Sequence, residues 1–161
     1  MRAAVLSDCH DSLANLEKAL ARMREAKVAL FCGDFCAPFT LKMLADGFSG
    51  PIHTVFGNND GDAFLLLRIA QQAGNVIFHQ PMAELELSGR KVAVVHYPEF
   101  GEALALSGKY DAVFNGHNHT AETHVLGSTL WANPGALMGR LGQASMGLYE
   151  TDTNDFEIIK L

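Results

Sequence analysis

The sequence is short of positive charge. Its 161 residues include 12 lysines and arginines against 18 aspartates and glutamates, which gives a formal net charge of -6. A protein that binds long nucleic acid without sequence preference needs lysine and arginine contacts to the phosphates. The acidic balance therefore argues against long nucleic acid as a partner.

Long apolar runs and paired cysteines are also missing. No stretch approaches the roughly 18 consecutive apolar residues of a membrane span, and the apolar run at residues 3–6 is too short for the core of a signal peptide. The three cysteines are Cys9, Cys32 and Cys36. An odd number in a chain without an export signal indicates reduced thiols, so we expect a cytoplasmic protein without membrane contact.

The chain shows no tandem repeat, no low-complexity tract and no linker rich in proline or serine. Apolar residues make up 48% and charged residues 19%, a globular composition that excludes disorder. The length fits one domain and leaves little room for a second. We therefore expect residues 1–161 to form a single domain.

Apolar periodicity predicts alternating strands and helices in the first half of the chain. Short aliphatic runs predict buried strands at residues 2–7, 28–32 and 52–56. Helical spacing predicts a helix after Ser12, which is a candidate N-cap, and Pro38 opens a second helix that ends at Gly47. A third helix is expected at residues 60–74, with Asp60 or Asp62 near its cap and Gly74 at its end.

The second half of the chain is richer in strands. One helix is expected at residues 99–106, and strands are expected at residues 83–87, 91–95, 111–115, 122–126, 129–132, 145–150 and 156–159. Alternating strands and helices followed by antiparallel strands are typical of a layered α/β sandwich.

Seven histidines in this short chain are the feature that most needs an explanation, because histidine is the commonest metal ligand and a proton shuttle. Side chains that can bind metal follow five of the predicted strands. In chain order they are Asp8 and His10, Asp34, Asn58 and Asp60, His96, and His117 and His119. Ligands of open α/β sheets bind beyond the carboxyl ends of the strands, so we expect these side chains to meet at one edge.

Each of these motifs alone has an ordinary explanation. An Asp-x-His or Gly-Asp pair can form a turn, Asp60 can cap the following helix, and His96 can be a hydrogen-bonded core histidine. The ordinary explanation would have to apply five times at the same sheet edge. Two carboxylates, four imidazoles and one amide are also too many donors for one tetrahedral zinc, and they suit two metal ions that share a bridging carboxylate. Two such ions can clamp a phosphoryl oxygen.

The ordered set of motifs resembles the calcineurin-like metallophosphoesterase superfamily, in particular its small bacterial and archaeal phosphodiesterase branch. The motifs are Asp8-x-His10, Gly33-Asp34, Gly57-Asn58-x-Asp60, His96 and Gly116-His117-x-His119, and Asn133-Pro134-Gly135 is similar to a turn of that branch. The resemblance implies a four-layer α/β/β/α sandwich, with two mixed β-sheets flanked by helices.

The same resemblance implies roles for these residues. Asp8, His10 and His119 would hold a first divalent ion, Asn58, His96 and His117 a second, and Asp34 would bridge both. Manganese is the first expectation for the ions, and iron, zinc, nickel and cobalt are alternatives. The implied reaction is in-line attack of a metal-bridging hydroxide on a small phosphate diester, with Asp34, Asn58, His96 and His117 at the reacting centre.

Three nearby residues are candidates for support of the site or for substrate contact. In phosphatases of this superfamily the position of Asn59 often holds a histidine that protonates the leaving group, and the position of Asp60 orients that histidine. An amide cannot act as a general acid, so we expect poorer turnover of alkoxide than of aryl leaving groups. Tyr97 stands where the family usually has glycine, and it is either a rim tyrosine or a stacking surface for a base or aryl group.

Three other interpretations remain. A phosphomonoesterase or nucleotidase would use the same site. A protein-binding scaffold, like the retromer subunit that shares this fold, would have lost activity, although loss of activity usually erodes the ligands. A metallo-β-lactamase-like hydrolase is disfavoured because the run His-x-His-x-Asp-His is absent.

Residues 64–67 place apolar side chains all round one helix, which indicates a contact in a homo-oligomer. His53, His79 and His124 match no motif, and we expect them to be solvated or hydrogen-bonded structural residues.

Overall fold

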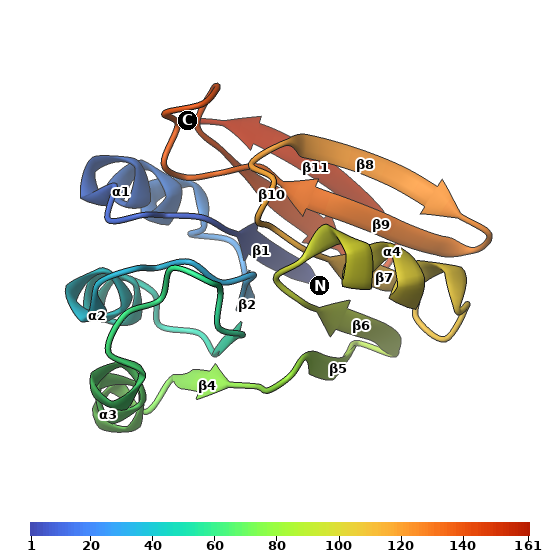
Figure 1. Cartoon of the computed structure of the whole chain (residues 1–161). Coiled ribbons are helices and arrows are strands. Elements are labelled where there is room, and N and C mark those ends of the chain that lie inside the picture. Colours follow the sequence, from blue (N-terminus) through green and yellow to red (C-terminus); the bar gives the residue numbers. More distant parts are fainter.

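The computed structural model describes all 161 residues and consists of four layers (Figure 1). Three helices cover the outer face of one β-sheet, a second sheet packs against the inner face of the first, and a fourth helix covers the second sheet. The helices are α1 (Leu13–Arg22), α2 (Pro38–Gly47), α3 (Ala63–Ala73) and α4 (Pro98–Leu106). No helix is both long enough and apolar enough to cross a membrane.

The first sheet has six strands in the order β11-β10-β1-β2-β3-β4. Its strands are β1 (Arg2–Leu6), β2 (Val28–Phe31), β3 (Ile52–Thr54), β4 (Val76–Phe78), β10 (Ser145–Glu150) and β11 (Asp155–Lys160). Strands β1 to β4 are parallel, whereas β10 is antiparallel to both β1 and β11. The parallel strands are connected through α1, α2 and α3, as the alternating pattern predicts.

The second sheet has five strands in the order β5-β6-β7-β9-β8. Its strands are β5 (Ala83–Leu87), β6 (Arg90–Val94), β7 (Ala112–Phe114), β8 (Ala121–Leu126) and β9 (Thr129–Pro134). The central strands β6, β7 and β9 are parallel, and the outer strands β5 and β8 are antiparallel to their neighbours. Both sheets are therefore mixed, and the predicted α/β/β/α sandwich is confirmed.

The central strands are apolar on both faces because both faces are covered. In β1, Ala4 and Leu6 belong to the core between the helices and the first sheet, whereas Ala3 and Val5 belong to the core between the two sheets. All four side chains are fully buried. A parallel strand packed on both sides is expected to be a continuous apolar run, which is the pattern that identified these strands in the sequence.

Three local expectations were incomplete or wrong. Strand β4, which lies at the edge of the first sheet directly after the turn at Gly74, was not predicted. Ser12 lies at the N-cap of α1, but its side chain makes no capping hydrogen bond. Asp62 caps α3 by accepting a hydrogen bond from the Leu65 amide, so Asp60 is not the cap and is free for another role.

The histidines outside the motifs are hydrogen-bonded, as expected. The Nδ1 atom of His53 lies 2.9 Å from Nε2 of His79, and burial lowers the pKa of both side chains. His124 lies 3.1 Å from the carboxylate of Glu122 on β8. On α3, Leu66 is buried but Phe64 and its neighbours are exposed, so the expected oligomer contact stays a prediction.

The ring of Phe31 offers a test of the helix-side core. Phe31 on β2 is fully buried and stacks on Phe35 with a centroid distance of 3.8 Å. Phe31→Ala should lower the free energy of unfolding by about 3–5 kcal/mol, because it leaves a cavity in a close-packed core. The measurement is urea unfolding followed by circular dichroism. Phe64→Ala is the matched control, since that ring is 78% exposed; equal losses in the two variants would contradict the assignment of the core.

Candidate metal centre

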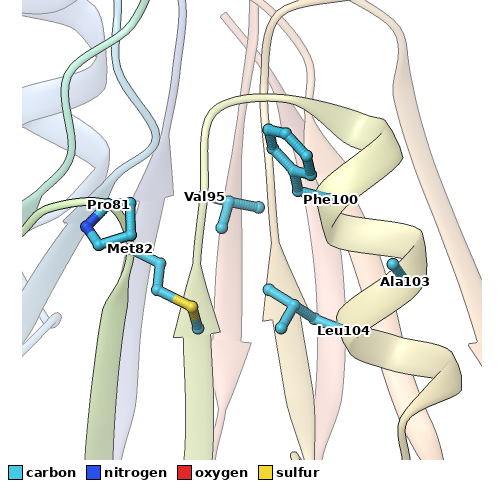
Figure 2. Close-up of a pocket in the computed structure, with 6 residues that line it drawn as sticks. All are labelled: Pro81, Met82, Val95, Phe100, Ala103 and Leu104. Carbon is cyan, nitrogen blue, oxygen red and sulfur yellow. The ribbon is translucent and has the colours of Figure 1, made fainter.

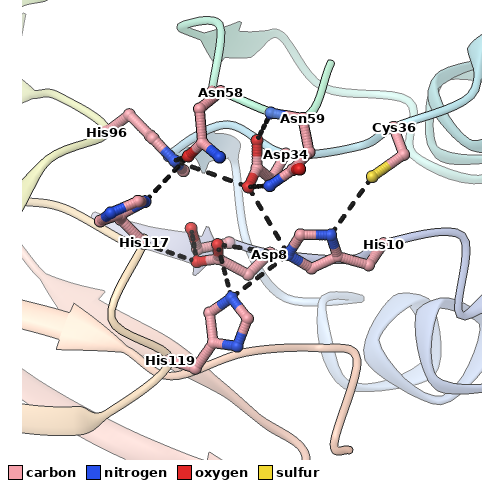
Figure 3. A network of polar contacts seen from close by, with 12 residues as sticks. Asp8, His10, Asp34, Cys36, Asn58, Asn59, His96, His117 and His119 are labelled. Carbon is pink, nitrogen blue, oxygen red and sulfur yellow. Dashed lines mark hydrogen bonds and ion pairs between the residues drawn. The ribbon is translucent and has the colours of Figure 1, made fainter. Parts of the chain in front are cut away.

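The carboxyl ends of the parallel strands in both sheets meet at one edge of the sandwich, and all seven predicted metal ligands lie there (Figure 3). Asp8 and His10 follow β1, Asp34 follows β2 and Asn58 follows β3. The second sheet supplies the others: His96 follows β6, and His117 and His119 follow β7. The cluster therefore depends on contact between two separate sheets.

The backbone at this edge is strained. Five of the seven ligands have a positive φ, in the left-handed region that favours glycine: Asp8 (52°), His10 (44°), Asp34 (66°), His117 (72°) and His119 (60°). Each such non-glycine residue costs about 1–3 kcal/mol and persists only where the surroundings enforce it. The concentration of strain in these loops is typical of a functional site.

One group of side chains surrounds Asp8. Nε2 of His10 lies 3.2 Å from Nε2 of His119, and Nε2 of His119 lies 3.2 Å from Oδ1 of Asp8. The distance between His10 Nε2 and Asp8 Oδ1 is 3.7 Å. Asp8 is fully buried, and the two histidines are partly buried.

A second group surrounds Asn58. Its Oδ1 atom lies 2.9 Å from Nε2 of His96 and 2.8 Å from Nδ1 of His117. Asp34 lies between the two groups: its Oδ2 atom is 3.5 Å from His10 Nε2 and 3.6 Å from His96 Nε2. Asp34 is the one carboxylate placed about equally between a histidine of each group.

These donors fit divalent metal ions. Two ligand atoms bound at about 2.1 Å to one ion lie roughly 3.0–3.4 Å apart, close to the distances within each group. Oδ1 of Asp8 is buried without a hydrogen-bond partner although it points into the first group. Asp8, His10 and His119 form one candidate metal-binding group, and Asp8, Asp34 and His96 form another. Asp8 therefore lies within reach of both halves of the cluster.

Hydrogen bonds keep Asp8 ionised in spite of its burial. Burial alone would raise the pKa of Asp8, but interactions with His10, the Ser7 hydroxyl and the His117 amide together lower it. Both the Ser7 hydroxyl, at 2.5 Å, and the His117 amide, at 2.9 Å, donate to Oδ2. The interaction with Asp8 raises the pKa of His10 in return. Oδ1 of Asp8 is thus a buried, charged oxygen that accepts no hydrogen bond and faces the imidazoles of His10 and His119, as suits a metal ligand.

Asp60 accepts hydrogen bonds from three backbone amides in two loops. Its Oδ2 atom accepts hydrogen bonds from the Asp34 amide (3.0 Å) and the Gly57 amide (2.7 Å), and its Oδ1 atom accepts one from the Cys36 amide (3.0 Å). The carboxylate therefore joins the loop after β2 to the loop after β3. These are the loops that carry Asp34 and Asn58.

Asn59 binds Asp34 with both of its donors. Its backbone amide donates to Asp34 Oδ1 at 2.7 Å, and its side-chain amide donates to Asp34 Oδ2 at 2.8 Å. The side chain fixes the orientation of the central carboxylate. It supplies no titratable group to the site.

Two glycines allow the loops to approach this closely. A Cβ atom on Gly57 would lie 2.1 Å from Asp34 Oδ1, and one on Gly116 would lie 1.8 Å from the Ser7 hydroxyl and 2.5 Å from Asp8 Oδ2. Any side chain at either position would displace a carboxylate of the cluster. The Gly57-Asn58 and Gly116-His117 motifs therefore owe their glycines to close packing.

Sequence reasoning missed several supporting contacts. Nδ1 of His96 lies 2.7 Å from the Cys32 carbonyl oxygen, and Nδ1 of His10 lies 3.2 Å from the sulfur of Cys36. Burial and nearby carboxylates raise the pKa of Cys36 to about 12, so the thiol is protonated. Cys9 and Cys32 are buried in the cores, as expected of packing residues.

Asn133 and Tyr97 complete the surroundings. The Asn133 side chain donates to the Gly116 carbonyl at 3.0 Å and so supports the loop of His117 and His119 from the end of β9. The ring of Tyr97 packs edge-on against His96 and His117, with centroid distances of 5.0 and 4.8 Å. The Asn133-Pro134-Gly135 motif had marked Asn133 in the sequence, and the position directly after His96 had marked Tyr97.

Asp60→Asn tests whether the loops depend on the Asp60 carboxylate. In the variant one oxygen becomes an amide that faces a backbone N–H, so a buried donor loses its acceptor and unfolding should become easier by about 1–3 kcal/mol. The measurements are urea unfolding of the metal-free protein and a manganese-binding isotherm, which should also weaken. Asp62→Asn is the control, because asparagine is an equally good N-cap; an unchanged stability and isotherm in Asp60→Asn would contradict the role of Asp60.

Comparisons with known proteins agree with this geometry. Residues 1–154 match the model of the calcineurin-like phosphoesterase superfamily domain. A phosphodiesterase of Methanocaldococcus jannaschii is 28% identical over 166 residues, which cover 100% of this chain and 99% of that protein. The solved structure of an archaeal phosphodiesterase, also 28% identical, superposes with a TM-score of 0.92 and covers 100% of both chains.

A third similarity extends only to the fold. Wild-type Vps29 of Entamoeba histolytica, solved in complex with zinc, is 17% identical with a TM-score of 0.70 and covers 100% of this chain and 98% of its own. The family match spans nearly the whole chain and includes every motif that carries the metal-binding cluster. The chain therefore belongs to the calcineurin-like phosphoesterase superfamily, and the family match together with the metal-binding geometry identifies it as a metal-dependent phosphoesterase.

Proposed function

We propose that the chain is a phosphodiesterase that hydrolyses a small phosphate diester by in-line attack at a centre of two divalent ions. Asp8, His10 and His119 would hold one ion, Asn58, His96 and His117 would hold the other, and Asp34 would bridge them. The observation that carries this proposal is the place of Asp34 Oδ2, 3.5 Å from a histidine of the first group and 3.6 Å from a histidine of the second.

When bound, such a pair of ions supplies an activated water and positive charge for the phosphoryl oxygens. The protein's part is to hold the donors in position. The Cys32 carbonyl accepts from Nδ1–H of His96, which leaves Nε2 free as a ligand, and Asn59 holds both oxygens of Asp34. The buried side chains Asp8, Asp34 and His96 form the floor of the site.

The open side of the centre indicates where the ester binds. Asn58 and Asn59 are exposed and His117 is partly exposed, so the phosphate approaches from the side of these residues. No lysine or arginine is needed to bind the anionic phosphate here, because two divalent ions would carry four positive charges against the two carboxylates of the proposed ligand set. Manganese suits the mixture of carboxylate, amide and imidazole donors, and iron, zinc, nickel or cobalt would suit it as well.

The proposed site should cleave most readily those esters whose alcohol can leave as an anion, without being protonated. The amide of Asn59 is bound to Asp34, and neither Asn58 nor Asn59 can protonate a leaving group. An aryl oxide leaves readily as the anion, whereas an alkoxide does not. The chain thus lacks the residue that a phosphatase of this family would use to protonate a poor leaving group.

Removal of the central carboxylate and of a ligand from the second sheet tests the proposed centre. Asp34→Asn and His117→Ala should each lower manganese-dependent hydrolysis of bis(4-nitrophenyl) phosphate by more than about a hundredfold, because each removes a metal ligand. Bound manganese is measured in parallel by elemental analysis. Asp46→Asn is the control, since this exposed carboxylate on α2 pairs only with Lys42; activity that survives in Asp34→Asn and His117→Ala would show that the site is wrong.

The dependence of rate on leaving group tests the role of Asn59. In a series of methyl phosphodiesters whose second alcohol ranges from 4-nitrophenol to phenol and ethanol, the rate should fall steeply as the pKa of the leaving alcohol rises. Hydrolysis of 4-nitrophenyl phosphate, measured beside the series, compares monoester with diester. A rate that stays flat across the series would mean that another group supplies the proton.

A further inference from the structure

An apolar groove lies between α4 and the strands β5 and β6 (Figure 2). Its volume is about 380 Å³, within the range of roughly 300–1,000 Å³ that is typical of small-molecule sites. The lining residues are Pro81, Met82, Val95, Phe100, Ala103 and Leu104. Figure 2 shows Val95 on the floor, Phe100 and Leu104 on the helix side, and Pro81 and Met82 opposite.

The lining selects against polar ligands. None of the six side chains is charged or carries a hydrogen-bonding group stronger than the thioether of Met82. A sugar or nucleobase placed here would lose hydrogen bonds to water without replacement, which is unfavourable. A hydrocarbon or simple aryl group would lose nothing and would bury apolar surface.

A short aromatic path joins the groove to the metal centre. The floor residue Val95 immediately precedes His96, and Tyr97 immediately follows it. The Tyr97 ring lies 4.8 Å from the ring of His117 on one side and 6.0 Å from the ring of Phe100 on the other, edge-on in both cases. A ligand with its phosphate at the metals can therefore reach the groove over one tyrosine ring.

Both of these rings are accessible to a ligand. Phe100 is 62% exposed and Tyr97 is 36% exposed, although both belong to the segment that leads from the buried ligand His96 into α4. Large aromatic side chains at this exposure provide unused contact area directly next to the reacting centre. The absence of a general acid at Asn59 points to the same chemistry, because an aryl alcohol leaves without protonation.

We propose that this groove, with Tyr97 between it and the metal centre, binds an uncharged aryl or compact apolar alcohol group of the phosphodiester. The inference rests on the proposed function for the position of the phosphate, but not for the affinity of the groove itself. It defines the substrate as a diester with at least one apolar, aromatic arm, rather than a dinucleotide or a sugar phosphate.

A binding experiment without metal tests the groove alone. The protein, with ¹³C-labelled methyl groups, is titrated with 2-naphthol in the absence of metal ions. We expect the methyl signals of Val95, Leu104 and Met82 to shift, and those of Leu106, which is on α4 but outside the groove, to stay in place. Ala103→Trp should fill the groove and abolish the shifts, whereas Glu102→Trp, which adds the same bulk outside the groove, should keep them. Unshifted signals in the unsubstituted protein would overturn the proposal.

Inhibition with metal present links the groove to the active site. Biphenyl-4-yl phosphate should inhibit manganese-dependent hydrolysis of bis(4-nitrophenyl) phosphate about tenfold more tightly than methyl phosphate, since only the biphenyl arm extends past Tyr97 into the groove. Phe100→Ala and Ala103→Trp should remove this preference, and Leu106→Ala and Glu102→Trp should not. Equal inhibition by both esters in the unsubstituted enzyme overturns the link. Absence of any manganese-dependent hydrolysis, with naphthol shifts intact, would instead refute the proposed function and leave the groove as a binding site.

Discussion

The position of one carboxylate, Asp34, depends on almost everything else at the edge of the sandwich. Asn59 donates two hydrogen bonds to its oxygens, Asp60 accepts from its backbone amide, and Gly57 makes room for it by having no side chain. Its backbone lies in the left-handed region, a conformation that these contacts enforce. Because Asp34 lies between the two histidine groups, a shift of this residue would alter both halves of the cluster together.

The fold supplies the stability that this strain requires. Strands β1 and β2 are covered on both faces, and their apolar side chains contribute alternately to the core under the helices and the core between the sheets. The loops that follow these strands are anchored to fully buried segments. Similar anchoring on β6 and β7 brings His96 and His117 to the same place from the other sheet. Two rigid sheets thus hold a set of ligands that neither could assemble alone.

The sequence predicted the parts of this structure that local patterns encode. Uninterrupted apolar runs identified the central strands, and the polar residue at each strand end identified the side chains that meet at this edge, because parallel strands place their carboxyl ends together. Strand β4 was missed, because it is an edge strand with one buried side chain and directly follows a helix. The contact of Asn59 with Asp34, the tie made by Asp60 and the contact between Cys36 and His10 could not be read, since each joins loops that are distant in the sequence. The groove could not be predicted from the sequence for the same reason, because Pro81, Val95 and Leu104 come from three separate parts of the chain.

The acidic net charge and the absence of a general acid at Asn59 both favour an ester with an apolar aryl arm. A protein with a formal charge of -6 does not attract phosphate over a distance, so recognition must rest on contacts at short range. In the proposed function the metal centre would bind the phosphate, and in the proposed groove an apolar arm would provide the remaining contact area. The same arm, when it is an aryl group, forms a leaving group stable enough to depart without the proton that Asn59 cannot give. The ester proposed for the groove is therefore also the ester that suits the proposed centre.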